Sequence, residues 1–449
     1  MAMRRPWLAF LLLFGLFCAA GPYDWNNRVN KESEAGNLKA ALSGTTAGLE
    51  EGSSSRRFAV IGLAVFALAV TVRRRWKERK GVPMEPGALV VGGGGDRSII
   101  VPLVAFVTFA AASTLWADDP GIVARRVFVF LCVAYAAWAV ARAWTLSDLL
   151  SFSVLACLTT LLVSLGLEIM RGQFHPFDGG YRLSGLTHPN NHAQECAVVI
   201  IASLAAMRLV PERRRFYVLT AIAGAGLMVL TRSRTALLAV VVALGFGALY
   251  IMPKRRVLGV GLVMAAVVIA VGVFGADLVD SAKHALLFGR QESTADVGTL
   301  TGRTELWSEL MTYIGARPIV GYGFDGFWGP IHTASVALSL GWVVPHAHNG
   351  YIEMLLDLGV VGLVLFLAVL FAGLSHAHRR LRESPGDTEA LLGVTLLVWL
   401  LVAMMAEKIV PQSGYASFLI MVVLAREAMA SPVPVASHTV RAYARAVSA

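Results

Sequence analysis

The stretch Val344-Pro345-His346-Ala347-His348-Asn349-Gly350-Tyr351 runs directly into Ile352-Glu353-Met354-Leu355-Leu356-Asp357-Leu358-Gly359-Val360-Val361-Gly362. The apolar part predicts a membrane-spanning helix over 350–374, because a span needs about 20 predominantly apolar residues. His346 and His348 stand just before this helix. Histidine is the side chain best suited to move a proton near neutral pH, and the positive end of a helix favours its neutral form. The alternative is that this polar stretch only caps the helix.

The composition is that of a membrane protein. The 449 residues are 56% hydrophobic and 15% charged, whereas about a quarter of the residues in soluble domains are charged. Apolar segments recur at 6–20, 58–72, 99–116, 127–143, 149–170, 193–210, 216–231, 235–252, 257–275, 350–374, 389–405 and 414–428. We therefore predict an all-α polytopic membrane protein with about twelve transmembrane helices and a large, partly helical periplasmic loop. The first segment is expected to be a retained helix, with a cleaved signal peptide as the alternative.

The basic residues indicate how the chain is oriented. The formal net charge is +10, and short basic runs lie between apolar segments at 73–75, 213–215, 254–256 and 379–380. Such runs mark cytoplasmic loops under the positive-inside rule, so we expect no nucleic-acid partner. With the N-terminus inside, the 171–192 loop, the 231–235 turn and the 276–348 loop face the periplasm.

Two of these outer segments are rich in polar side chains. Arg232 and Arg234 lie in the 231–235 turn, where they depart from the positive-inside trend. They are either membrane anchors with their heads in water or an anion site, because the planar guanidinium fork suits phosphate oxygens. Arg182 and Asn190 lie in a polar loop that suits a hydroxyl-rich ligand, or that is only a turn leading into a helix.

The long outer loop is expected to be partly helical. Residues 301–314 read as an amphipathic helix whose apolar face consists of Leu306, Leu310, Tyr313 and Ile314. Arg317-Pro318 should end it. The following turn, 321–328, is rich in aromatic residues that either stack on a sugar or rest at the membrane interface.

Metal binding is not expected. The pair His346 and His348 could bind a metal with His332 or His188 as a further ligand, but no carboxylate or cysteine lies at a suggestive spacing. The four cysteines lie in or beside apolar segments and indicate neither a disulfide framework nor a CxxC site.

The motifs together resemble the O-antigen ligase and O-antigen polymerase superfamily of bacterial envelope glycosyltransferases. The main one is His348-Asn349, followed after nine residues by Gly359-Val360-Val361-Gly362. The resemblance covers roughly residues 180–370. Further similar segments are Thr301-Gly302-Arg303 with Trp307, Pro318-Ile319-Val320-Gly321-Tyr322-Gly323, Thr231-Arg232-Ser233-Arg234, and Arg182-Leu183-Ser184-Gly185 with Pro189-Asn190.

The resemblance implies a metal-independent, inverting glycosyltransferase with a GT-C-like fold and no cofactor. Its donor would be a glycan on undecaprenyl diphosphate, and its acceptor a lipid or glycan hydroxyl. In the ligases, a histidine at the position of His348 is essential. Arginines matching Arg303 and one of Arg232 and Arg234, with Arg234 preferred, are thought to hold the diphosphate. His346, Asn349, Arg182, Asn190 and Tyr322 complete the expected substrate site.

The chemistry of a lipid-borne donor supports these roles. No nucleotide sugar is expected outside the membrane, and fixed guanidiniums suit the neutralisation of a departing diphosphate. The acceptor hydroxyl then needs only a base, which His348 would supply.

We therefore expect an O-antigen ligase-type enzyme of lipopolysaccharide biosynthesis in the bacterial inner membrane, active on the periplasmic face. The first alternative is an O-antigen or exopolysaccharide polymerase. An alternative of another class is a transporter or flippase for polyprenyl-linked saccharides, which often shows repeated halves and broken helices. The expected regions are N-terminal helices over 1–180 with a flexible loop at 21–57, a ligase-like core over 181–375 containing the 276–348 loop, and C-terminal helices with a cytoplasmic tail over 376–449.

Overall fold

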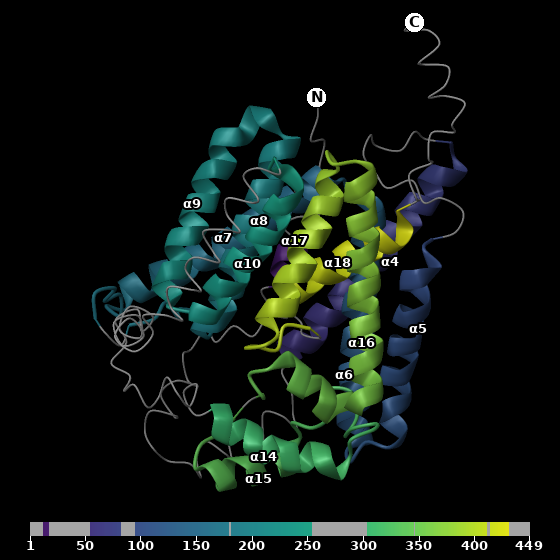
Figure 1. Cartoon of the computed structure of the whole chain (residues 1–449), viewed down its shortest axis with the longest axis vertical. Helices are drawn as coiled ribbons and strands as arrows, with labels where there is room; N and C mark the ends of the chain where they lie inside the picture. The colour runs from purple at the N-terminus through teal and green to yellow at the C-terminus, as the bar shows by residue number, and fades with distance from the viewer. Residues whose placement is uncertain are drawn as a thin grey trace, which may run out of the picture.

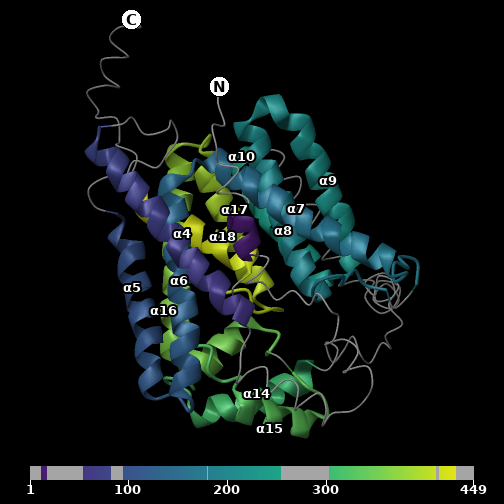
Figure 2. The ribbon, with the colours of Figure 1, turned by 180° about the vertical axis from the view of Figure 1, so that it is seen from behind.

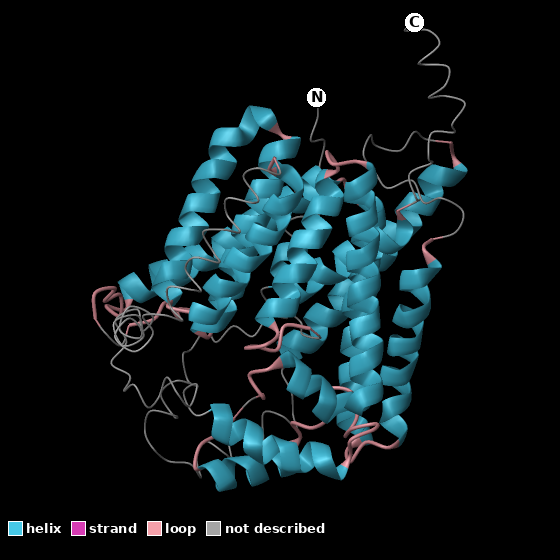
Figure 3. Ribbon diagram, in the orientation of Figure 1, coloured by secondary structure: helices cyan, strands magenta, loops and turns pink. Residues whose placement is uncertain are grey.

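Helices form every regular element that the structure describes. This computed structural model describes residues 12–17, 54–81, 95–178, 181–253, 303–344, 346–410 and 414–430 (Figure 3). The helices are α4 (Ser54–Arg79), α5 (Arg97–Ala112), α6 (Pro120–Ala143), α7 (Leu146–Met170), α8 (Pro189–Leu209), α9 (Arg214–Thr231), α10 (Arg234–Ile251), α14 (Arg303–Ala316), α15 (Pro330–Leu340), α16 (Gly350–Glu383), α17 (Thr388–Ala403) and α18 (Tyr415–Met429). The 3₁₀ turns are η1 (Ser113–Leu115) and η2 (Pro211–Arg213).

Seven of the described helices are long and apolar enough to cross a membrane: α5 with η1, α6, α7, α8, η2 with α9, α10 and α16. This confirms an all-helical, polytopic membrane protein. The predicted segment 257–275 and most of 6–20 lie outside the described residues, so the total of about twelve spans stays a prediction. The predicted loop 21–57 also lies outside them up to residue 53, and its last residues already belong to α4.

The helices form a bundle with two different ends. Figures 1 and 2 show α4 to α10 and α16 to α18 packed together, with α14 and α15 lying across one end of α5, α6 and α16. We call this end the loop face. The basic runs 73–75, 213–215 and 379–380 lie at the opposite end, at the ends of α4, α9 and α16, which we call the basic face. This separation agrees with the orientation predicted from the arginines.

The segment on the loop face has an apolar core of its own. Leu306 and Leu310 of α14 are fully buried, and Tyr313 and Ile314 pack partly buried beside them. The predicted amphipathic helix is thus confirmed, and it ends before Arg317-Pro318 as expected. The same cluster includes Phe327, Trp328, Val336, Val344 and Leu356, so it joins α14, α15 and the start of α16.

A break inside α16 fixes this segment to the membrane bundle. Gly359 has φ 62° and ψ −165°, which divides α16 into two helical parts. The freed backbone groups pair with the 318–323 turn: Val360 N–H donates to the Pro318 carbonyl (2.9 Å), and Tyr322 N–H donates to the Leu356 carbonyl (2.9 Å). A Cβ on Gly359 would lie 2.3 Å from the Ile319 carbonyl carbon. Only glycine therefore allows the turn to approach this closely.

Replacing Gly359 by alanine should lower the thermal stability of the detergent-solubilised protein strongly. The new methyl group overlaps the Ile319 backbone and the residue keeps a positive φ, a conformation that alone costs roughly 1–3 kcal/mol in a non-glycine residue. Gly245→Ala in α10 is the matched control, because a Cβ there meets no atom within 4 Å. Equal melting temperatures for the two variants would contradict the proposed role of the break.

Candidate active site

The carboxylate of Glu407 lies at the centre of a cluster of polar side chains on the loop face. Glu407 lies in the segment between α17 and α18, and its Oε1 accepts a hydrogen bond from Asn190 Nδ2. Arg303 Nη2 and His348 Nδ1 each lie 3.3 Å from the same oxygen. His346 Nε2 lies 3.9 Å from Oε2. Residues from the starts of α8, α14 and α16 thus meet at a single, largely buried acidic group.

Arg182 extends this cluster towards the 231–235 turn. Its Nη2 donates to Asn190 Oδ1 (2.6 Å), and its Nε donates to the Thr231 carbonyl (3.1 Å). Asn190 lies in the first turn of α8, next to Pro189 at the helix start, where proline is well tolerated. The polar loop predicted to contact a ligand therefore reaches the cluster through Arg182 and Asn190.

The histidine-bearing loop has a defined conformation. His348 has φ 49°, and its backbone N–H donates to His346 Nδ1 (3.2 Å). The two imidazole centroids are 4.1 Å apart. Between them, the Ala347 carbonyl accepts from Trp307 Nε1 (2.8 Å), and the Ala347 N–H donates to Glu353 Oε1 (2.9 Å). α14 and the first turn of α16 therefore hold both histidines in place.

A second cluster of charges lies next to the first. Lys408 Nζ is 2.6 Å from Asp325 Oδ1, 3.8 Å from Glu353 Oε2 and 3.7 Å from Asp357 Oδ2. Arg126 from α6 also pairs with Asp325 (3.7 Å). Burial alone would lower the pKa of Lys408, but the neighbouring carboxylates outweigh it and raise that pKa. Lys408 therefore stays protonated and anchors the segment that carries Glu407.

The environment sets the charge states of the site. Burial, reinforced by His348, lowers the pKa of His346 to about 3. Burial, reinforced by Arg182, lowers the pKa of His188 to about 4. Burial would raise the pKa of Glu407, but the hydrogen bond with His348 and the charges of the adjacent histidines and Arg303 outweigh it and lower that pKa to about 2. At neutral pH the site thus holds an ionised carboxylate beside a neutral His346.

The remaining predicted site residues lie elsewhere on the loop face. Asn349 caps α16, its side chain accepting from the Tyr351 (2.9 Å) and Ile352 (3.2 Å) N–H groups. Tyr322 is buried in the loop-face core and donates its hydroxyl to the Tyr313 carbonyl (3.0 Å). Arg232 is the C-cap of α9 with φ 49° and donates to the Pro176 carbonyl (3.1 Å). Arg234 begins α10 in the same tight turn.

Sequence reasoning missed the role of Glu407. It found no carboxylate at a suggestive spacing from the histidine pair. The folded chain brings Glu407 to His348 across 59 positions. The available signal was the pair Glu407-Lys408, since two charges directly after an apolar helix require partners when they are buried.

The same geometry brings three potential metal ligands together. Ligand atoms of His346, His348 and Glu407 lie within 4.8 Å of one another, a set that zinc could use. The contacts of Glu407 argue against a resident metal ion, however. Its Oε1 already accepts from Asn190 and lies beside the Arg303 guanidinium, whose positive charge repels a cation.

The buried histidines should make stability depend on pH. Below about pH 6.5 an unfolded chain protonates both histidines, whereas the folded chain protonates His188 only near pH 4 and His346 near pH 3. The contribution of these two histidines to the free energy of unfolding is therefore fully present above about pH 6.5. It decreases as the pH falls towards 4. We expect the melting temperature in detergent to decrease over this window, and His346→Gln to decrease less steeply. The exposed His378→Gln is the control, and identical slopes for both variants would contradict the assignment.

Comparison with known proteins agrees with the motifs. Residues 218–367 match the O-antigen ligase family. The chain is 26% identical over 326 residues to the exopolysaccharide production protein ExoQ of Rhizobium meliloti, covering 68% of this chain and 72% of that protein. It is 30% identical over 105 residues to an O-antigen ligase of Pseudomonas aeruginosa, covering 23% of this chain and 24% of that protein. Over residues 218–367, about a third of its length, the chain is therefore similar to the O-antigen ligase family.

Proposed function

We propose that this protein is an O-antigen ligase-type glycosyltransferase that moves a glycan from an undecaprenyl-diphosphate carrier to an acceptor hydroxyl at the loop face, on the periplasmic side of the bacterial inner membrane. The observation that carries the proposal is the cluster in which Glu407 contacts both His348 and Arg303. A general base and a phosphate-binding cation therefore lie side by side, as transfer from a diphosphate donor requires.

His348 is proposed as the base, and Glu407 as its partner. Because His348 Nδ1 lies 3.3 Å from Glu407 Oε1, the opposite ring nitrogen, Nε2, would take the proton of the acceptor hydroxyl. The carboxylate stabilises the imidazolium that forms, as it does in other histidine–carboxylate pairs. The acceptor oxygen forms the new bond to the anomeric carbon while the bond to the diphosphate oxygen breaks. Attack opposite the leaving group inverts the anomeric centre.

Arg303 is proposed to neutralise the diphosphate as it leaves. Its Nη2 is 3.3 Å from Glu407, so a bound diphosphate would compete with the carboxylate for the same guanidinium and lie next to His348. Arg234, or Arg232, would contribute from the 231–235 turn. That turn is tied to the cluster through the hydrogen bond from Arg182 to the Thr231 carbonyl.

The other residues are proposed to position substrate. Asn190 and His346 border Glu407, and Arg182 contacts Asn190. All three offer donors to glycan hydroxyls. Asn349 and Tyr322 were predicted for the same role. Their contacts support an indirect one, because Asn349 caps α16 and Tyr322 packs in the loop-face core. The lipid part of the donor would lie in the bilayer.

The acceptor distinguishes two versions of this function. A ligase would use a lipid A core, and a polymerase would use a second carrier-linked repeat. The match to an exopolysaccharide production protein extends over 68% of this chain, whereas the match to an O-antigen ligase covers 23%. This difference in extent favours a second candidate, exopolysaccharide polymerisation, with the same site and the same bond-forming step.

Substituting His348 should remove glycan transfer while the protein still folds. We expect His348→Ala to reduce the rate at least about a hundredfold, the usual loss for a missing general base. Glu407→Gln should reduce it less, and Arg303→Ala should mainly weaken donor use. The assay uses purified protein in nanodiscs with a polyprenyl-diphosphate-linked glycan, first with lipid A core and then with donor alone.

The exposed residues His378 and Arg214, on the basic face, supply the controls His378→Ala and Arg214→Ala. Transfer to the core identifies a ligase, and chain growth from donor alone identifies a polymerase. Full activity of His348→Ala would contradict the proposed base. With the protein in liposomes, movement of the donor across the bilayer without any transfer would instead identify a transporter.

Removing divalent metals should leave transfer unchanged. Charge neutralisation at the leaving group is assigned to guanidiniums, so excess EDTA should not alter the initial rate. Activity that is lost in EDTA and restored by Zn²⁺ would instead assign His346, His348 and Glu407 as metal ligands.

A further inference from the structure

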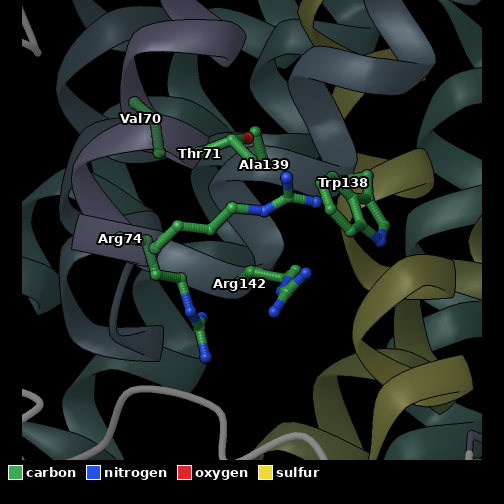
Figure 4. Close-up of a pocket in the computed structure, with 7 residues that line it drawn as sticks. Val70, Thr71, Arg74, Trp138, Ala139 and Arg142 are labelled. Carbon is green, nitrogen blue, oxygen red and sulfur yellow. The ribbon is translucent and has the colours of Figure 1, made fainter. Parts of the chain in front are cut away.

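A pocket with an excess of positive charge lies at the basic face, far from the candidate active site. Residues of α4 and α6 line it, among them Arg74, Arg75 and Arg142 (Figure 4). Thr71 and Trp138 form part of its wall. The glycan-transfer proposal uses none of these residues, so the pocket requires a separate explanation.

The charges around the pocket are unbalanced. Arg74 Nε pairs with Glu78 Oε1 at 2.8 Å. The nearby charges that act on Arg142 are those of Arg74, Arg75 and Glu78. Arg75 and Arg142 form no ion pair among the described residues, so their two positive charges are not compensated there. Such an excess beside a low-dielectric membrane interior favours the binding of an anion.

Arg142 has a donor available for such an anion. Its guanidinium lies over the Trp138 ring, 4.7 Å from the ring centroid, which fixes its orientation. Its buried Nε has no hydrogen-bond partner among the described residues. A buried N–H without an acceptor is costly, and a phosphate oxygen is the acceptor that the planar guanidinium fork suits best.

The outer surface of α4 indicates where such a phosphate comes from. Ile61, Val65, Leu68 and Val72 are exposed large apolar residues. Their spacing of three or four residues places them in one stripe along the helix. The next position of that stripe is Arg75, at the pocket. An amphiphile with an apolar chain along the stripe would therefore bring its head group to the arginines.

We propose that the arginines lining this pocket bind the phosphate group of an acidic phospholipid from the leaflet at the basic face, with one acyl chain along the α4 stripe. Basic pockets between membrane helices suit acidic head groups, and the excess charge selects them over zwitterionic ones. Free phosphate shares the head-group chemistry but has no chain to occupy the stripe. It should therefore bind much more weakly. The proposal does not depend on the proposed glycan transfer.

Native mass spectrometry of the full-length protein in detergent tests this proposal. The protein is titrated with phosphatidylglycerol, with phosphatidylcholine of the same acyl chains, and with inorganic phosphate. We expect a saturable phosphatidylglycerol adduct, and we expect Arg142→Gln to weaken it about tenfold because one charge-assisted contact is lost. Arg214→Gln, which removes an exposed arginine on the same face, is the matched control and should retain the adduct.

Three outcomes would overturn the proposal. Equal affinities of the Arg142→Gln and Arg214→Gln variants would assign the adduct to general surface charge. Equal binding of the two phospholipids would remove the selection by charge. Displacement of the adduct by inorganic phosphate at a similar concentration would assign the pocket to a free anion. Should Arg142→Gln fail to fold, Arg75→Gln replaces it, because this residue is exposed at the end of the stripe.

Discussion

The break of α16 at Gly359 is the constraint on which the rest of the loop face depends. A continuous helix would leave no free backbone groups there. The break presents them to the 318–323 turn, and the hydrogen bonds of Val360 and Tyr322 close that junction. α14 and α15 pack on the same turn and on the start of α16. The histidine loop, which lies between α15 and α16, is thereby held at the end of the membrane bundle.

Charge compensation explains why distant residues meet at one place. A buried carboxylate is costly unless donors and cations surround it. Glu407 meets this requirement with Asn190, Arg303 and His348, from three different helix starts. The next residue, Lys408, is a buried cation, and its charge is compensated by the carboxylates of Asp325, Glu353 and Asp357. Glu407 and Lys408 therefore connect the segment between α17 and α18 to both charge clusters, the one around Glu407 and the one around Lys408.

The two ends of the bundle use arginine differently. On the loop face, Arg182 and Arg303 have polar partners around Asn190 and Glu407, which hold their guanidiniums in fixed positions. On the basic face, Arg74 pairs with Glu78 at the pocket between α4 and α6, whereas Arg75 and Arg142 form no ion pair among the described residues. Fixed guanidiniums suit a substrate that must be positioned for reaction. An excess of charge suits an anion that remains bound.

The sequence by itself indicated the described membrane helices and which of their ends lie on the same face of the bundle, because apolar length and the distribution of arginines are local properties. It also singled out His348, Arg303, Arg182 and Asn190, which the folded chain gathers around Glu407. Only the tertiary structure decided that Glu407 joins them, since its partners lie up to 217 positions away along the chain. Tertiary contacts likewise gave Asn349 a capping role and Tyr322 a place in an apolar core. Ion pairs and buried contacts form between segments that are distant along the chain. In the sequence alone, their members are visible only as isolated charged and aromatic residues.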